Sequence, residues 1–446
     1  MTQTQAQTQT QTQTQAQAIA GSHEQTARAL GERAAGAARP LSCAPTAQKD
    51  AALLHLAGLL SDPERQAQVL AHNALDMQAG KEAGLSAALL DRLRLDAGRL
   101  AALGRAVQEI VALPDPVGEV VESWLRPRGF RVEKVRIPLG VLLLIYESRP
   151  NVTVDAAALA LKSGNAVILR GGKEARHSNL ALSQLVRESL RAHGLPEDGC
   201  VLVEDPDRAL MLALLRQNGL IDLCIPRGGE SLIRFVVEHA RIPVVQHYQG
   251  ICHLFVERSA DLAMAVELVE NGKCSRPGVC NALECLLIDE PVAAQFLPML
   301  ADKLAGFGVE LRLEDDARAL LPTRLPTGLR VVTAQPSDFG QEFLDLILAV
   351  RIVPSLDAAM DHIARYGSLH SEVIVTQDEA AARRFVRQVC ASFVGWNVST
   401  RFNDGGELGL GAEVGISTTK LHAFGPMGLR ELCATKFVVT GQGQTR

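Results

Sequence analysis

The sequence predicts an α/β protein with two domains, each built from parallel strands that alternate with helices. Two observations support this prediction. Short runs rich in Leu, Ile and Val recur from residue 141 onward, and segments long enough for crossover helices separate them. In addition, the 446 residues are 47% hydrophobic, which is enough apolar material for more than one core.

The amino-acid composition argues against several classes of binding partner. The net charge is −5, with acidic and basic residues interspersed, so neither nucleic acid nor a membrane surface is an expected partner. The longest clean apolar run, 141–145, is far too short to cross a bilayer. Nine cysteines, an odd count with no C-x-x-C spacing, predict reduced thiols in the cytoplasm and give little support for a metal site. A small anionic substrate fits this composition best.

The first part of the chain is predicted to be a tail followed by helices. Residues 1–18 are almost wholly Thr, Gln and Ala, without the basic and apolar regions of a secretory signal, so 1–23 is predicted to be a disordered tail. Residues 24–118 show apolar spacing typical of helices, with a cap and proline at 61–64.

A β hairpin is predicted at 119–137, around the turn at 126–129. It has so little apolar surface that we expect it to lean on a partner chain, which favours a homo-oligomer. A terminal strand within 431–446 is expected to pair with this hairpin, in the same chain or in a neighbour.

Residues 138–246 predict a doubly wound sheet of the Rossmann type, which binds a nucleotide at the carboxyl edge of its strands. The predicted strands are 141–145, 166–169, 200–203, 220–225 and 242–245, with helices at 153–163, 175–193, 206–217 and 229–240. A second α/β domain is predicted at 247–430, with strands at 253–256, 282–288, 329–333, 347–353, 373–376 and 393–398, and helices at 260–271, 291–306, 356–366 and 378–390.

Two segments at the carboxyl edge of the first sheet are candidate cofactor sites. Arg170, Gly171 and Lys173 follow one strand, and the two cations suit a 2'-phosphate, which favours NADP over NAD. A solvated basic loop is the alternative. Arg227, Gly228 and Gly229 follow another strand and open a helix, whose N–H groups would face a pyrophosphate.

Cys280 is a candidate nucleophile. It follows a Pro-Gly turn between a helix and an apolar strand, and a reactive thiol needs exposure, backbone donors and positive charge, here from Lys273 or Arg276. The alternative is a buried small hydrophobe. On spacing alone the two interpretations are near even, and Cys274 and Cys285 remain rivals.

Three motifs resemble the gamma-glutamyl phosphate reductases, a family of the aldehyde-dehydrogenase superfamily. They are SRPGVCNALE at 275–284, the segment from IPLG at 137–140 through YESRPNVTVD at 146–155 to LKSGNA at 161–166, and the segment from Asn397 through STRF at 399–402 to GLGAEVGIST at 409–418. The resemblance spans roughly 24–443, and three long motifs in order make coincidence implausible.

This resemblance implies an aldehyde-dehydrogenase-like fold with a catalytic domain at 247–430 and oligomerisation elements at 119–137 and 431–446. It implies reduction of L-glutamyl 5-phosphate with NADPH, in proline biosynthesis, through a thioester on Cys280. The Cys280 N–H and the Asn151 amide would hold the oxyanion, although Asn151 is equally well an ordinary turn or cap residue. Glu342 resembles the residue that binds the nicotinamide ribose.

The substrate's phosphate and α-carboxylate need cations, and Arg149, Arg276 and Arg401 are the motif arginines available; surface ion pairing is the alternative for each. The glycine-rich segment 409–415 is predicted to be a flexible loop that closes on substrate. A glutamate 5-kinase is a possible partner that hands over the labile acyl phosphate.

The main competing function is a hydrolytic aldehyde dehydrogenase. Such enzymes carry a general-base Glu at the start of the catalytic domain, whereas the matching residues 246–250 here are QHYQG, without a carboxylate. His247 is a possible base, although a packed histidine is commoner. A silent nucleotide-binding scaffold is disfavoured by the intact Cys280 segment, and a kinase by the lack of a G-x-x-x-x-G-K-[ST] loop.

Overall fold

The computed structural model describes residues 3–446, with side chains from residue 21 onward. The chain divides into two compact units: unit 1 holds 1–246, 410–415 and 427–446, and unit 2 holds 247–409 and 416–426. The division between residues 246 and 247 is the one at which the second domain is predicted to begin. However, 410–415 and 427–430 pack with unit 1 and not, as predicted, with the second domain.

Unit 1 opens with helices. These are α1 (Gln3–Ser42), α2 (Thr46–Ser61), α3 (Pro63–Glu82), α4 (Ala87–Leu93) and α5 (Ala97–Ala112). The predicted cap is present, since the Asp62 side chain accepts from the Arg65 N–H and Pro63 opens α3. α1 begins at Gln3, so residues 3–23, which the sequence predicts to be part of a disordered tail, are helical. Residues 1 and 2 of that tail lie outside the described part.

The sheet of unit 1 has four parallel strands in the order β5-β4-β3-β6. They are β3 (Val141–Tyr146), β4 (Ala166–Arg170), β5 (Cys200–Leu202) and β6 (Leu223–Arg227), joined through α6 (Asn151–Lys162), α7 (Arg176–Ala192), α8 (Arg208–Leu214) and the short helices η1 (Lys173–Ala175) and η2 (Glu197–Gly199); α9 (Glu230–His239) follows β6. The winding direction reverses between β3 and β6, and ligands of such folds bind at this point.

The predicted strand at 242–245 is wrong. Only an isolated bridge between Cys224 and Val244 forms there. Pro243 has no N–H to give to a ladder, and its carbonyl accepts from the Cys224 N–H.

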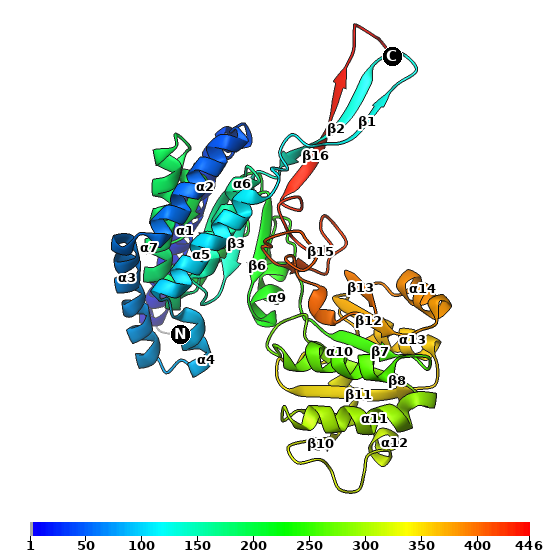
Figure 1. The fold of residues 1–446 in the computed structure, drawn as a ribbon. Helices are drawn as coiled ribbons and strands as arrows, with labels where there is room; N and C mark the ends of the chain where they lie inside the picture. The colour runs from blue at the N-terminus through cyan, green and yellow to red at the C-terminus, as the bar shows by residue number, and fades with distance from the viewer. Residues whose placement is uncertain (1–2) are drawn as a thin grey trace. The chain divides into compact units, whose positions relative to one another are not determined.

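A three-stranded antiparallel arm belongs to unit 1 and projects from it (Figure 1). It consists of β1 (Val120–Leu125), β2 (Arg131–Pro138) and β16 (Cys433–Thr440), in the order β1-β2-β16. The predicted hairpin therefore pairs with the terminal strand of its own chain.

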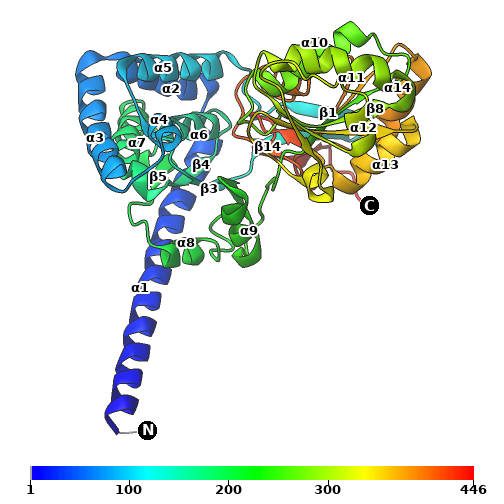
Figure 2. The ribbon, with the colours of Figure 1, turned by 90° about the horizontal axis from the view of Figure 1, so that it is seen from below.

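Unit 2 contains a parallel sheet of seven strands in the order β10-β9-β11-β8-β7-β12-β13. The strands are β7 (Cys252–Val256), β8 (Leu283–Asp289), β9 (Glu310–Leu313), β10 (Arg330–Thr333), β11 (Ile347–Val353), β12 (Ser371–Val375) and β13 (Phe393–Trp396). Helices α10 (Leu262–Cys274) and α11 (Glu290–Ala305) cover one face, and α13 (Leu356–Tyr366) and α14 (Glu379–Gln388) the other (Figure 2). Smaller elements are α12 (Asp315–Ala319), η3 (Pro336–Gly340), η4 (Thr400–Phe402), β14 (Ile416–Ser417) and β15 (Gly425–Pro426).

Among the described residues, no helix is both long enough and apolar enough to cross a membrane.

Candidate active site

Cys280 lies in the turn between α10 and β8, at the amino-terminal edge of the unit 2 sheet. Cys280 is partly exposed. The Cys252 thiol donates to the Cys280 carbonyl oxygen over 3.2 Å, and a Cβ at Gly250 would overlap that oxygen. The start of β7 and the residue Gly250 before it therefore hold the backbone of Cys280, and only glycine allows so close an approach.

The other cysteines near this edge are poorer nucleophiles. Cys285 is buried in β8, and burial raises the pKa of Cys252 well above its usual value. Burial also raises the pKa of Cys274 to about 11. Because the thiolate is the reactive form, these environments leave Cys280 as the best candidate of the segment.

Arg276 and Arg401 provide positive charge at this position. Burial lowers the pKa of Arg401, the neighbouring Arg276 lowers it further, and the Cys280 thiol acts in the opposite direction. The predicted residues Cys280 and Arg276 therefore both act electrostatically on the predicted Arg401. Lys273 is not part of this group, contrary to the prediction that it supplies charge to the thiol.

Lys273 is fully buried in an ion pair with Glu284, with 2.7 Å between Nζ and Oε2. The ammonium also donates to the Asp345 carbonyl over 3.0 Å. It therefore joins α10 to β8 and the segment before β11. Burial raises the pKa of Glu284 to about 7, against the opposing effect of Lys273.

Asn281 was not singled out from the sequence, although it lies within the nucleophile motif. Its amide donates to the carbonyl oxygens of Arg401 and Asn403, over 3.3 Å and 3.0 Å. The residue next to the nucleophile therefore holds the segment that carries Arg401. Its place directly after Cys280 is the one signal by which it could have been found.

The segment 246–250 contains no carboxylate, and His247 lies beside His370, with ring centroids 5.9 Å apart. Burial, aided by His247, lowers the pKa of His370 to about 3. His370 is therefore neutral at physiological pH. His370 Nδ1 lies 2.8 Å from the Ser371 hydroxyl and 3.6 Å from the Cys252 sulfur. His370 therefore packs against Cys252, the residue whose thiol donates to the Cys280 carbonyl.

Glu342 lies in the loop between η3 and β11. It acts electrostatically on Glu284, and two residues later the Leu344 N–H donates to the Glu284 carboxylate over 3.2 Å. The Leu344 carbonyl is also the nearest atom to the position of a Cβ on Gly278, at 3.8 Å. The Glu342 loop thus lies next to the nucleophile loop within unit 2.

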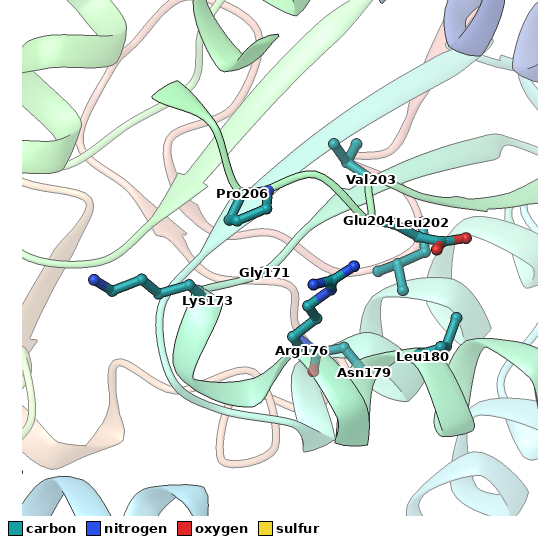
Figure 3. A pocket seen from close by; sticks show the side chains of 10 residues that line it. Gly171, Lys173, Arg176, Asn179, Leu180, Leu202, Val203, Glu204 and Pro206 are labelled. Carbon is teal, nitrogen blue, oxygen red and sulfur yellow. The ribbon is translucent and has the colours of Figure 1, made fainter. Parts of the chain in front are cut away.

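A pocket opens in unit 1 at the carboxyl edge of β4 and β5 (Figure 3). It is lined by Gly171, Gly172, Lys173, Arg176, Asn179, Leu180, Leu202, Val203, Glu204 and Pro206. Gly171 and Lys173 are therefore at the pocket, as predicted for a cofactor site. A Cβ on Gly171 would overlap the Asn179 amide, so the bare backbone lets α7 approach.

The cations of this pocket differ from those predicted. Arg170 does not line it; its guanidinium donates to the Pro206 carbonyl over 2.7 Å, and burial lowers its pKa. Arg176, the first residue of α7, lines the pocket in its place, while the Lys173 side chain extends away from the other labelled side chains (Figure 3). Arg176 was missed because its orientation depends on how η1 joins α7.

Arg227, Gly228 and Gly229 lie where β6 ends and α9 begins. The Gly229 N–H donates to the Glu147 carboxylate over 3.2 Å, and a Cβ on Gly228 would meet the same carboxylate at 2.7 Å. A side-chain anion thus already occupies the start of α9, where the sequence predicts a pyrophosphate.

Asn151 is exposed and opens α6, and its amide donates to the Asp155 carboxylate over 3.0 Å. It makes no side-chain cap of the helix. Arg149 is exposed in the loop before α6, and its N–H donates to the Glu147 carbonyl.

Close packing at two of its glycines holds the segment 409–415 against unit 1. A Cβ on Gly411 would overlap the Leu113 side chain, and one on Gly415 would overlap the Arg227 guanidinium. Val414 and Gly415 also exchange backbone hydrogen bonds with Met427. That the segment is a flexible loop that closes on substrate stays a prediction.

One buried cluster in the described chain groups three side chains of metal-ligand type, His253, Cys285 and His362. Arg351 donates to His362 Nδ1 over 3.4 Å, so in the neutral ring Nε2 carries the proton and faces the Cys285 sulfur at 3.6 Å. The second ring, His253, forms a buried ion pair with Glu372 at 2.9 Å. These contacts join the cluster to Arg351 and Glu372, while buried His253 Nε2 has no hydrogen-bond partner among the described residues.

Comparison with known proteins places the chain in a family. The model of the aldehyde dehydrogenase family matches residues 2–319. The gamma-glutamyl phosphate reductase of Anaeromyxobacter dehalogenans is 57% identical over 94% of this chain and 97% of its own length. That of Xanthomonas campestris is 52% identical over 94% of this chain and 100% of its own.

Solved structures agree. The crystal structure of gamma-glutamyl phosphate reductase from Thermotoga maritima is 42% identical, with a TM-score of 0.91, covering 94% of this chain and 99% of that one. An acetylating aldehyde dehydrogenase from Geobacillus thermoglucosidasius, 16% identical with a TM-score of 0.68, shares the fold. The chain therefore belongs to the aldehyde dehydrogenase family and, within it, to the gamma-glutamyl phosphate reductases.

Proposed function

We propose that this protein reduces L-glutamyl 5-phosphate to L-glutamate 5-semialdehyde with NADPH and releases phosphate, a step of proline biosynthesis. The observation that carries the proposal is Cys280, which is partly exposed near Arg276 and Arg401, together with segment 246–250, which contains no carboxylate. The near full-length relatives with this name support it.

The chemistry follows from these groups. The Cys280 thiolate attacks the acyl carbon and expels phosphate, which leaves a thioester on Sγ. Positive charge from Arg276 and Arg401 favours the thiolate and attracts the anionic substrate. Because residues 246–250 offer no carboxylate to activate water, the thioester is protected from hydrolysis. We assign the oxyanion to the Cys280 N–H and the Asn151 amide, and Glu342 to the cofactor ribose.

The unit 1 pocket suits a nucleotide with a 2'-phosphate, because Arg176 and Lys173 line it beside two glycines. NADPH, when bound, supplies the hydride that reduces the thioester. A solved structure of an engineered glycolyl-CoA reductase, which shares the fold, holds bound NADP+. We also propose a cytoplasmic location, on the cysteine usage, and a homo-oligomer, on the arm; a glutamate 5-kinase that delivers the acyl phosphate stays a prediction.

The test follows the reverse reaction. NADPH formation is measured from NADP and glutamate 5-semialdehyde, with and without phosphate, for the wild type and Cys280→Ala. We expect phosphate-dependent turnover that the substitution lowers at least about 1,000-fold, since the nucleophile is removed. Cys43→Ala, an exposed cysteine in unit 1, is the matched control.

Two outcomes would contradict the proposal. Turnover that needs no phosphate would indicate a hydrolytic aldehyde dehydrogenase, and undiminished activity in Cys280→Ala would remove the assigned nucleophile.

A further inference from the structure

The starting point is a carboxylate and a guanidinium in unit 1, Asp155 on α6 and Arg227 at the end of β6. Both are partly buried, and Arg227 acts electrostatically on Asp155. Nevertheless no ion pair joins them in the described chain, and the Asp155 carboxylate accepts a hydrogen bond from the Asn151 amide over 3.0 Å. Two opposite charges that act on one another without an ion pair leave both groups able to bind a ligand that carries both charges.

Asp155 lies one helical turn after Asn151. Side chains four residues apart share a face of a helix. The Asn151 amide donates to Oδ2 of Asp155, which leaves Oδ1 for a second donor. A carboxylate acceptor thus lies beside the amide to which we assign the acyl oxygen of the substrate.

Arg227 is covered by the segment that resembles the family's substrate loop. The guanidinium packs against the bare Cα of Gly415, where a Cβ would overlap Nη1, and φ of Gly415 is 151°. Only glycine permits this backbone and this approach. The close packing joins Arg227 to the 409–418 motif, and not to the cofactor pocket at β4 and β5.

We propose that Asp155 and Arg227 form the recognition site for an α-amino acid head group: Asp155 binds the substrate ammonium and Arg227 its carboxylate. The inference rests on the proposed function, which supplies a substrate with such a head group. It moves Arg227 from the predicted cofactor site to the substrate, because the Glu147 carboxylate already occupies the adjacent start of α9.

The buried surroundings of Asp155 disfavour its ionised form. Burial raises the pKa of Asp155 to about 6, although the Asn151 hydrogen bond and Arg227 act in the opposite direction. An ionised group in such a place lowers stability, and functional sites commonly retain groups of this kind. A bound ammonium would supply the missing opposite charge at Oδ1.

The experiment compares three aldehydes in the phosphate-dependent reverse reaction, matched for free aldehyde concentration. They are glutamate 5-semialdehyde, 5-oxopentanoate, which lacks the ammonium, and pentanal, which lacks both charges. The readout is the ratio of kcat/KM values, in which any common effect on the oxyanion or on folding cancels. Asp302→Asn, an exposed aspartate on α11, is the matched control.

Asp155→Asn is expected to lower the ratio for glutamate 5-semialdehyde over 5-oxopentanoate by about 10- to 100-fold, the loss typical of one charged hydrogen bond. Arg227→Gln is expected to lower the ratio for 5-oxopentanoate over pentanal by a similar factor. Asp302→Asn should change neither ratio.

Equal losses on all three aldehydes would overturn the inference, because they would show that Asp155 only orients Asn151. Unchanged ratios in both variants would overturn it as well. A wild type without phosphate-dependent turnover is a different result, which contradicts the proposed function itself.

Discussion

At the scale of single residues, the surroundings of each ionisable group decide its role. Cys280 is partly exposed near two arginines, whereas Cys252 and Cys285 lie in the strands below it. Three of the side chains around the proposed nucleophile hold backbone carbonyls by hydrogen bonds, namely Cys252, Asn281 and Lys273. The nucleophile loop is therefore supported on several sides before any substrate binds.

Asp155 gives a stability prediction at this scale. Its pKa is raised to about 6 from 3.8, so between these values the folded state binds a proton that the unfolded state has lost. Stability therefore falls as pH rises through this window, by up to about 3 kcal/mol. Asp155→Asn removes this effect, so we expect the variant to be more stable than the wild type at pH 8, and the difference to vanish near pH 4. Urea unfolding at the two pH values measures it. A variant equally destabilised at both would show that the carboxylate's packing matters more than its charge.

At the scale of elements, the arm and the α10–β8 connection show how segments distant in sequence combine. Lys273 fixes the end of α10 to Glu284 in β8, so the loop that carries Cys280 is held at both ends. The arm pairs β2 with β16, residues about 300 apart in the chain, over the whole length of both strands. Its face carries exposed apolar side chains, among them Trp124 and Phe437, whose rings lie edge to face at 6.2 Å.

This exposed face leads to a prediction about assembly. Apolar side chains on an isolated three-stranded sheet are unfavourable in water, so we expect a second copy of the chain to cover them. Replacing Trp124 and Phe437 together by Ser should shift the protein to a smaller species in sedimentation velocity at about 10 μM. The matched control is Val386→Ser, which replaces an exposed apolar side chain on α14. The same sedimentation coefficient in the wild type and the arm variant would contradict the predicted role of the arm.

At the scale of the whole molecule, buried histidines make stability depend on pH. Burial lowers the pKa of His362 and of His370 to about 3, in both cases from 6.5. Between these values the unfolded state takes up protons that the folded state cannot, so their effect is to lower stability as pH falls from 6.5. His253 acts oppositely, since Glu372 raises its pKa to about 10 despite burial.

His370 allows the prediction to be tested. His370→Asn removes one such group, and we expect it to reduce the loss of stability between pH 7 and pH 5 by about 2 kcal/mol. Chemical denaturation at the two pH values gives this difference between wild type and variant. The control is His72→Asn on α3, which replaces a partly exposed histidine and should leave the pH dependence unchanged. A pH dependence equal to that of the wild type in His370→Asn would show that the ring titrates alike in the folded and unfolded states and would contradict the prediction.

The sequence by itself determined the strand and helix alternation of both units and the pairing of the terminal strand with the hairpin, though not that both belong to one chain, and it supplied the proposed nucleophile segment 275–284. Local burial and turn chemistry specify these features, because a buried parallel strand must be apolar and a helix start needs a cap. The short β9 and helix α12 were missed because each has too few residues for a clear pattern.

Only the tertiary structure decided where the charged side chains point. Lys273 turns into a buried ion pair, Arg170 to the Pro206 carbonyl, Arg176 into the pocket, and Arg227 to Gly415. The partner of each long side chain is set by which faces of distant elements meet, and residues 227 and 415 come together only when the chain folds. A sequence pattern indicates whether a position is buried. It does not indicate which group a flexible cationic side chain at that position will contact.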